Sequence, residues 1–308
     1  MASDADDLLS IILPLYNRGE VVGNAIRSVL NQTYPKWELI VVDDCSTDDS
    51  PETVGRYSDE RVKLLRLNEN SGPASARNHG IKSCRGKYVS FLDSDDEYEP
   101  DFLYESRKKL RNSDPSIGFI WTGVRFIGDD SKLSLANGVW KPQFKKTPYL
   151  TLLHDLHIGT NSGISVKREV FDKVGYFDFR LKAAEDTDFF LRVSQEFSFD
   201  YIDKPLINIH RSNTDRLSKN YKKIFEAYRI IVPKHSGEIT QSKKLRLKYY
   251  YKLMWLSYHA NDKVAARKYF RAVLKDNKIS AKAWFVFILF ELLGHKLGAQ
   301  VHLKLSAA

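Results

Sequence analysis

The sequence predicts a mixed α/β fold built on a mostly parallel sheet, followed by a separate α-helical region. Short apolar runs alternate with helical patterns through the first two thirds of the chain, as in sheets that helices cover on both faces. Three of these runs end in polar or acidic residues, which a parallel sheet would gather at one edge. After about Arg216 glycine and proline become rare, and helical periodicity takes over. We therefore expect two domains, residues 1–215 and residues 216–308.

The expected elements follow from hydrophobic periodicity and turn residues. In the first domain we expect strands at residues 9–15, 37–42, 62–67, 88–92, 161–166 and 202–210, and helices at 21–30, 75–83 and 185–193. Residues 117–150 indicate further strands and a loop. The second domain is expected to contain a helix with an apolar stripe from Leu245 to Ala260, then helices at 262–276 and 280–294.

Charge divides the chain in the same place. The net charge is +9, but residues 216–308 carry +15 and residues 1–215 carry −6. A basic helical region suits three roles: a face for anionic membranes, an interaction or oligomerisation module, or a solvated cap on the first domain. No nucleic-acid-binding motif accompanies the charge, so we do not expect nucleic acid as a partner.

Composition also indicates the cellular compartment of the protein. Cys45 and Cys84 are too few for a disulfide scaffold and suit free thiols in a reducing compartment. The first residues lack a signal-peptide pattern. No uninterrupted apolar run has the length of a membrane span, and the longest, residues 283–293, suits a buried or interfacial helix. We expect a cytoplasmic protein, with peripheral attachment to the inner face of the cell membrane as an option.

The acidic end of the strand at residues 88–92 is the first candidate site. Asp93, Ser94, Asp95 and Asp96 follow the apolar run directly. Carboxylates crowded at a strand end repel one another unless a cation binds, and their spacing suits a hard divalent ion that also holds a phosphate. An acidic surface turn is the alternative.

Three further candidates follow other elements of the sheet. Tyr16 offers a flat face on which a base could stack, although a strand-end aromatic can equally be packed. Asp44 could accept a hydrogen bond from a base or a ribose, or begin a turn. Arg77, near the start of a helix behind a glycine, could pair with a phosphate, hold the acidic cluster, or form a surface ion pair.

Two more candidates lie later in the chain. Glu185 and Asp186 at a helix start could supply a general base, which must reach the proton that it removes. They could also be ordinary acidic residues of a first helical turn. His210 follows a strand and could reach a metal or a diphosphate, or be structural.

In this order the motifs closely resemble the family 2 glycosyltransferases, an inverting group with the GT-A (nucleotide-diphospho-sugar transferase) fold. The resemblance covers about residues 8–215 and leaves the helical region out. It rests on residues 14–17, 28–34, 37–48, 72–78, 91–96, 174–178 and 185–186. Neither GxGxxG nor GxxxxGK[ST] occurs, which disfavours a dinucleotide oxidoreductase and a P-loop NTPase.

The resemblance implies a role for each matching residue. Asp186 would be the catalytic base, with Glu185 beside it. Mn²⁺ or Mg²⁺ would be held by Asp95, with Asp93 and His210 as further ligands. The nucleotide-sugar would contact Pro14, Tyr16, Asn17, Glu20, Asp44, Ser46, Arg77, Asp93, Ser94 and Asp96.

The implied reaction is inverting, metal-dependent transfer of a sugar from a nucleotide-diphospho-sugar, UDP-linked by default, to an acceptor hydroxyl. The acceptor would be a saccharide, lipid-linked or protein-linked, in bacterial cell-surface polysaccharide or glycoconjugate synthesis. Residues 154–160 are the candidate acceptor loop. Two alternatives remain, a nucleotide-sugar-binding scaffold without turnover and an unrelated nucleotidyltransferase with a similar core. An oligomer is compatible with the sequence.

Overall fold

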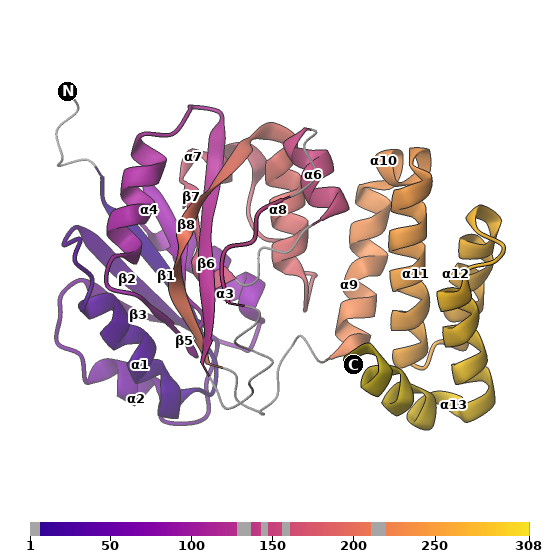
Figure 1. Ribbon diagram of the computed structural model, residues 1–308. Coiled ribbons are helices and arrows are strands. Elements are labelled where there is room, and N and C mark those ends of the chain that lie inside the picture. The colour runs from indigo at the N-terminus through magenta and orange to yellow at the C-terminus, as the bar shows by residue number, and fades with distance from the viewer. Residues whose placement is uncertain (1–6, 128–136, 143–146, 156–160, 211–219, 308) are drawn as a thin grey trace. The chain divides into compact units, whose positions relative to one another are not determined.

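The computed structural model describes residues 7–127, 137–142, 147–155, 161–210 and 220–307 (Figure 1). The chain forms two compact units. The first, called the sheet unit, comprises residues 1–179 and 186–213, and the second, called the helical unit, comprises residues 180–185 and 214–308.

The sheet unit is built on a mixed sheet of eight strands in the part of the chain that the structure describes. The strands are β1 (Leu9–Leu15), β2 (Trp37–Asp43), β3 (Val62–Arg66), β4 (Tyr88–Phe91), β5 (Asp96–Tyr98), β6 (Ile117–Ile127), β7 (Ile164–Lys167) and β8 (Ser198–His210), in the order β3-β2-β1-β4-β7-β6-β8-β5. β1 to β4 are parallel, β7 runs antiparallel to β4 and β6, and β5 is antiparallel to β8. The carboxyl ends of β1, β2 and β4 therefore lie at the same edge.

Both faces of the central strands are covered, which explains their continuous apolar runs. Ile11 and Leu13 belong to the same core cluster as Val22 of helix α1 (Gly19–Leu30). Ile12, between these two residues on β1, faces the opposite side and contacts helix α3 (Pro73–Ser83). A Cβ added to Gly80 of α3 would lie 2.6 Å from the Ile12 side chain. The other described helices of this unit are α2 (Ser50–Gly55), α4 (Phe102–Arg111), α6 (Pro148–His154), α7 (Glu169–Val174) and α8 (Glu185–Glu196).

The helical unit contains α9 (Tyr221–Lys234), α10 (Ser236–Gln241), α11 (Lys243–His259), α12 (Lys263–Asp276) and α13 (Ala281–Ala307). Met254, Phe270, Val286 and Phe290 share its core. Gly294 interrupts α13 with a left-handed φ of 70°, and Figure 1 shows two helical segments that meet at an angle.

Most of the expected strands and helices are confirmed, and the differences are as follows. Residues 161–163 form a 3₁₀ turn, so β7 starts only at Ile164. Seven described elements were not predicted from the sequence, namely α2, α4, α6, α7 and β5 in the sheet unit and α9 and α10 in the helical unit. The expected end of the last helix at Gly294 coincides with the non-helical residue at which α13 divides into two segments. By length and composition alone, Ala281–Leu303 could cross a membrane, which the apolar run at 283–293 did not indicate.

Candidate active site

The ends of β1 and β2 bring Tyr16 and Asp44 side by side. Leu15 is paired with Asp43, and the backbone N–H of Asp44 donates to the carbonyl of Leu15 at 2.8 Å. The Tyr16 side chain is 44 % exposed, so it is not the packed aromatic that was considered as an alternative. Its ring is open to a flat ligand at the strand edge.

The loops after these two strands are locked together by a small set of hydrogen bonds. The N–H of Asn17 donates to Ser46 Oγ at 2.9 Å, and Asn17 Oδ1 accepts from the N–H of Thr47 at 2.8 Å. Asn17 and Cys45 both adopt left-handed φ values, 49° and 62°. Such conformations are disfavoured for residues other than glycine, and they concentrate at functional sites. The predicted contact residues Pro14 and Glu20 flank this arrangement, half-buried and exposed respectively.

Asp44 anchors the turn that leads into α3. Its two carboxylate oxygens accept from the backbone N–H groups of Ser71 and Gly72, each at 2.7 Å, and its side chain is buried. Gly72 has a φ of 89°, which explains why a glycine stands there. The turn that was considered as the alternative role of Asp44 belongs instead to Asp43, which accepts from the N–H of Ser46.

Arg77 binds the acidic segment. Its guanidinium donates to Asp93 Oδ1 at 2.7 Å, and the residue is only 3 % exposed. The alternative that Arg77 forms a surface ion pair is therefore wrong. Its contact with Asp93 matches the predicted role of holding the acidic cluster. The contact joins α3 to the end of β4, where the candidate metal carboxylates lie.

Within the acidic segment the carboxylates are not equivalent. Ser162 Oγ donates to Asp96 Oδ2 at 2.5 Å and accepts from the N–H of Asp93 at 3.0 Å, and both Asp96 and Ser94 are buried. Asp93 and Asp95 are half-buried. The structure therefore favours Asp95 and Asp93 over Asp96 as carboxylates that an incoming cation could reach.

The acidic segment also perturbs a neighbouring phenol. Tyr98 donates its hydroxyl to the carbonyl of Phe91 at 2.7 Å. Burial and the negative charges of Asp93 and Asp96 raise the pKa of Tyr98 well above its usual range. Tyr98 therefore stays protonated and keeps this donor beneath the carboxylates.

The donor set fits a hard divalent cation. Among the described residues no three histidine, cysteine or acidic side chains converge on one point. Oxygen ligands from one or two carboxylates suit Mg²⁺ or Mn²⁺, provided that substrate phosphates complete the coordination. His210, predicted as a further ligand, has its Nε2 2.8 Å from Glu97 Oε1 on the neighbouring β5. Its part in metal binding stays a prediction.

The predicted base lies at the start of α8. Asp186 is half-buried, and its Oδ1 accepts from the N–H of Thr187 at 2.6 Å, while Glu185 is buried. Ala184, just before them, has a left-handed φ of 53°, a third strained backbone position in a predicted site segment. Asp186 is thus the more accessible carboxylate of the two, although its role as base remains a prediction.

One contact between α3 and the segment before α8 was not part of the predicted site. The amide of Asn78 donates to the carbonyl of Phe177 at 2.8 Å and accepts from its N–H at 3.0 Å. Because Asn78 follows Arg77 directly, α3 contributes both to the acidic cluster and to this segment. The position of Asn78 beside Arg77 in the motif was the available signal.

Comparison with known proteins decides the family. The sequence model of glycosyl transferase family 2 matches residues 10–175, more than half of the chain. The chain belongs to glycosyltransferase family 2. The expected enzyme class is thereby confirmed.

Relatives of this glycosyltransferase occur in several bacteria. It is 34 % identical over 61 % of its length to the UDP-Glc:alpha-D-GlcNAc-diphosphoundecaprenol beta-1,3-glucosyltransferase WfgD of Escherichia coli, covering 70 % of that protein. It is 29 % identical over 94 % of its length to an uncharacterized glycosyltransferase of Haemophilus influenzae, covering 97 %. A putative teichuronic acid biosynthesis glycosyltransferase, TuaG of Bacillus subtilis, is 40 % identical over 40 % of the chain, which spans 49 % of TuaG.

Solved structures confirm the GT-A-like fold. TarS of S. aureus in complex with UDP-GlcNAc superimposes with a TM-score of 0.63 at 19 % identity, over 86 % of this chain and 81 % of that one. The mannosyltransferase PcManGT of Pyrobaculum calidifontis, in complex with GDP-Man and Mn²⁺, gives 0.56 at 19 % identity, over 95 % and 82 %.

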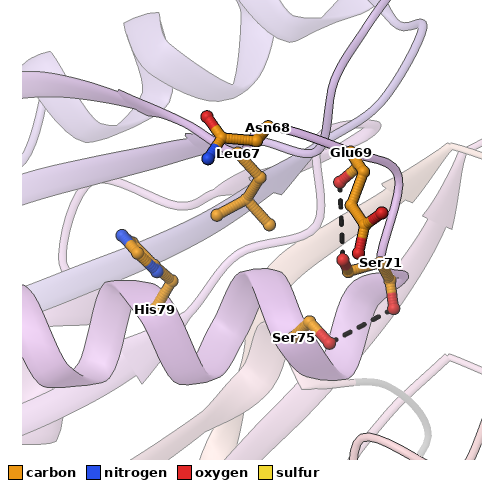
Figure 2. Close-up of a pocket in the computed structure, with 6 residues that line it drawn as sticks. All are labelled: Leu67, Asn68, Glu69, Ser71, Ser75 and His79. Carbon is orange, nitrogen blue, oxygen red and sulfur yellow. Dashed lines mark hydrogen bonds between the residues drawn. The ribbon is translucent and has the colours of Figure 1, made fainter.

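One feature of the glycosyltransferase lies outside the predicted site. A cavity of about 470 Å³ adjoins the turn that Asp44 holds (Figure 2), and Leu67, Asn68, Glu69, Ser71, Ser75 and His79 line it. Figure 2 shows Leu67 from the β3 loop and His79 from α3 pointing into the space between loop and helix. The i, i+4 spacing of Ser71, Ser75 and His79 was the available signal. Residues 156–160 of the predicted acceptor loop lie outside the described residues.

Proposed function

We propose that this glycosyltransferase transfers a sugar from a UDP-sugar to a hydroxyl of a lipid-linked saccharide during bacterial cell-surface polysaccharide synthesis, with inversion at the anomeric carbon. The observation that carries the proposal is the strand edge, where the open Tyr16 ring lies beside Asp44 and the Arg77–Asp93 pair borders Asp95. The names of WfgD, TuaG and the putative colanic acid biosynthesis glycosyl transferase WcaA of E. coli support the choice of donor, acceptor and pathway class.

The donor end is recognised by stacking and by hydrogen bonds. A uracil ring stacks on the exposed face of Tyr16, since aromatic stacking accepts any base. Asp44 faces the same edge and supplies acceptor oxygens, while the turn at Ser71 and Gly72 fixes the direction of its carboxylate. Discrimination among bases therefore depends on Asp44 and on the loop of Asn68.

The leaving group departs at the acidic segment. A divalent cation, when bound, neutralises the charge that grows on the diphosphate as the glycosidic bond breaks. Asp95 and Asp93 would hold that cation, and Arg77 keeps Asp93 in position through their 2.7 Å contact. Asp96, fixed by Ser162, is oriented toward the interior and supports the segment.

The acceptor is activated from the start of α8. Asp186 takes the proton of the acceptor hydroxyl as its oxygen attacks the anomeric carbon from the face opposite the diphosphate. A single displacement of this kind inverts the anomeric configuration and forms no covalent enzyme intermediate, by the geometric logic of inverting hydrolases. Glu185, buried beside it, orients the segment.

The proposal is tested with a panel of UDP- and GDP-sugars, read by release of the nucleotide diphosphate with and without Mn²⁺. We expect release from one or more UDP-sugars, dependent on the metal and increased by an undecaprenyl-diphosphate-linked acceptor. Release from GDP-sugars alone would refute the donor assignment. Donor binding without release under every condition would instead favour the scaffold alternative.

Variants of α8 test the base and the stereochemistry. Asp186→Asn should fold and bind UDP but lose about 10²–10⁴-fold in transfer rate. The control on the same helix, Glu196→Gln, should transfer normally because its ion pair with Lys173 is exposed. Near-normal turnover of Asp186→Asn would move the base to Glu185. A product with the anomeric configuration of the donor, observed by NMR, would refute inversion.

A further inference from the structure

The last helix of the chain exposes large apolar side chains to solvent. On α13, Trp284, Phe285, Ile288 and Leu292 are 40, 45, 47 and 79 % exposed. Ile279, in the turn before the helix, is 89 % exposed. Single exposed apolar residues are ordinary, but a contiguous group on one element marks an interaction surface.

These residues form one face of the helix. An α-helix advances about 100° per residue, so Trp284, Phe285, Ile288 and Leu292 fall within an arc of about 100°. Residues on the other side, Ala283, Val286, Leu289 and Phe290, are buried in the core of the helical unit. One apolar face of α13 therefore holds the unit together, and a second apolar face is left outward, with the Trp284 ring at its border packed edge-on against Phe270 with ring centroids 4.9 Å apart.

The helix is fastened to its own unit at mid-length. The carboxylate of Glu291 accepts from Arg267 of α12 at 2.7 Å and from the Tyr258 hydroxyl of α11 at 3.2 Å. Three residues later Gly294 breaks the helix. A membrane span requires about 20 continuous apolar residues released from the fold. The contacts of α13 thus suit a helix that lies along a surface, with its core-facing side in place.

The charges around the exposed face are positive. Asp276, at the end of α12, is held by Arg246 at 2.7 Å, so the acids of this segment are neutralised within the unit. Lys278, Lys282 and Lys296 are exposed, the first two before the apolar face in the sequence and the third after it. The indole N–H of Trp284 donates to the carbonyl of Lys278 at 3.3 Å, which places the ring against the basic turn.

We propose that the exposed face of α13, with its flanking lysines, binds the surface of an anionic lipid bilayer, with the helix parallel to the membrane plane. Apolar side chains enter the headgroup region while lysines meet anionic headgroups, and the two contributions together give stable attachment. Tryptophan is favoured at this depth because its ring is amphipathic. A second copy is a poorer partner, since a twofold contact would bring these lysines toward their own copies.

The inference deepens the proposed function, on which it rests for one point only: a lipid-linked acceptor lies at a membrane surface. Binding to vesicles requires no donor, acceptor or turnover. If the protein does not bind vesicles, the proposed reaction is unaffected. If the protein does not catalyse the reaction, the proposal that α13 binds a membrane surface is unaffected.

The test uses the whole 308-residue chain and sedimentation with vesicles. We expect binding to phosphatidylcholine vesicles with about 30 % phosphatidylglycerol to be at least tenfold stronger than to phosphatidylcholine alone, and to weaken with salt. The double variant Trp284→Ser/Phe285→Ser should lose about tenfold or more, because two interfacial anchors are removed. The control Tyr104→Ser removes a 44 % exposed aromatic of α4 and should bind as the wild type does. UDP release without vesicles should be unchanged in both.

A fluorescence experiment locates the contact. Trp284 is the exposed member of the five tryptophans, so brominated lipids should quench wild-type fluorescence, and Trp284→Phe should bind but lose this quenching. Absence of binding to anionic vesicles would overturn the proposal, as would equal binding by the Trp284→Ser/Phe285→Ser variant. A wild-type dimer in analytical ultracentrifugation that this variant dissociates, without vesicle binding, would assign the face to a second copy.

Discussion

The ion pair between Arg77 and Asp93 permits a quantitative test of how the acidic segment is held. Removing one partner of a fully buried pair costs about 3–5 kcal/mol, because the remaining charge is left without compensation. Here the Arg77 side chain is 4 % exposed and that of Asp93 is 31 % exposed. In Arg77→Met the remaining carboxylate can still meet water, so we expect the sheet unit to lose about 2–3 kcal/mol of unfolding free energy. UDP-sugar hydrolysis should fall as well.

Replacing the other partner of the pair should lower the unfolding free energy further. Asp93→Asn removes the carboxylate that pairs with the almost completely buried guanidinium of Arg77, so we expect a loss of about 3 kcal/mol or more. The double variant Arg77→Met/Asp93→Asn removes both charges. Its loss should be smaller than the sum of the single losses, with a coupling energy of about 2 kcal/mol.

Hydrogen–deuterium exchange measures these energies in the sheet unit alone. The slowest amides of β1 and β4 report its global opening, whatever the helical unit does. The matched control is Lys173→Met, whose pair with Glu196 joins side chains that are 55 and 48 % exposed and should change stability by less than about 0.5 kcal/mol. A coupling below about 0.5 kcal/mol, or an effect of Arg77→Met equal to the control, would refute the reasoning.

Three further outcomes are expected. Tyr16→Ala should weaken UDP binding by about 1–3 kcal/mol in calorimetry, because the stacking face is lost, whereas Tyr16→Phe should retain the affinity of the wild type. Equal UDP affinities of Tyr16→Ala and the wild type would show that Tyr16 does not stack on the base. Gly80→Ala should destabilise the sheet unit by about 1–3 kcal/mol in denaturant unfolding, because its Cβ would lie 2.6 Å from Ile12, and an unchanged midpoint would contradict the close packing. Burial, with the neighbouring charge of His302, lowers the pKa of His259 from 6.5 to about 4, so the folded helical unit disfavours the protonated ring. Its unfolding free energy, full above pH 6.5, should fall by about 3 kcal/mol as the pH drops toward 4, and the same loss in His259→Phe would contradict this origin.

The sheet and its functional edge could be predicted because their causes are local. Burial on both faces makes β1, β2 and β4 continuous apolar runs, and parallel pairing then gathers whatever follows them. For this reason the sequence could predict that Tyr16 and Asp44 lie at the same edge of the sheet. The role of Asp44 at the turn before α3 could not be predicted, because its carboxylate binds backbone groups 27 and 28 residues away.

Other parts of the site depend on contacts that no periodicity encodes. His210 meets Glu97 because β5 turns back to pair with β8, and a three-residue strand such as β5 leaves no hydrophobic pattern. Ser162 reaches Asp96 from a short turn whose residues suggested a strand. In the helical unit, Gly294 carried a typical helix-stop signal, and a second helical segment that the signal did not indicate follows it, with Ala299 and Val301 packed against the core.

The hydrogen bonds of Asp44 have a consequence for engineering donor choice. The carboxylate expected to read the base also fixes Ser71 and Gly72, and α3 starts there and carries Arg77 toward Asp93. Replacing Asp44 to accept another nucleotide would therefore shift the helix that positions the leaving-group end. Donor preference is better altered through Asn68 and the other cavity residues of the β3 loop, which can vary while the support of α3 stays intact.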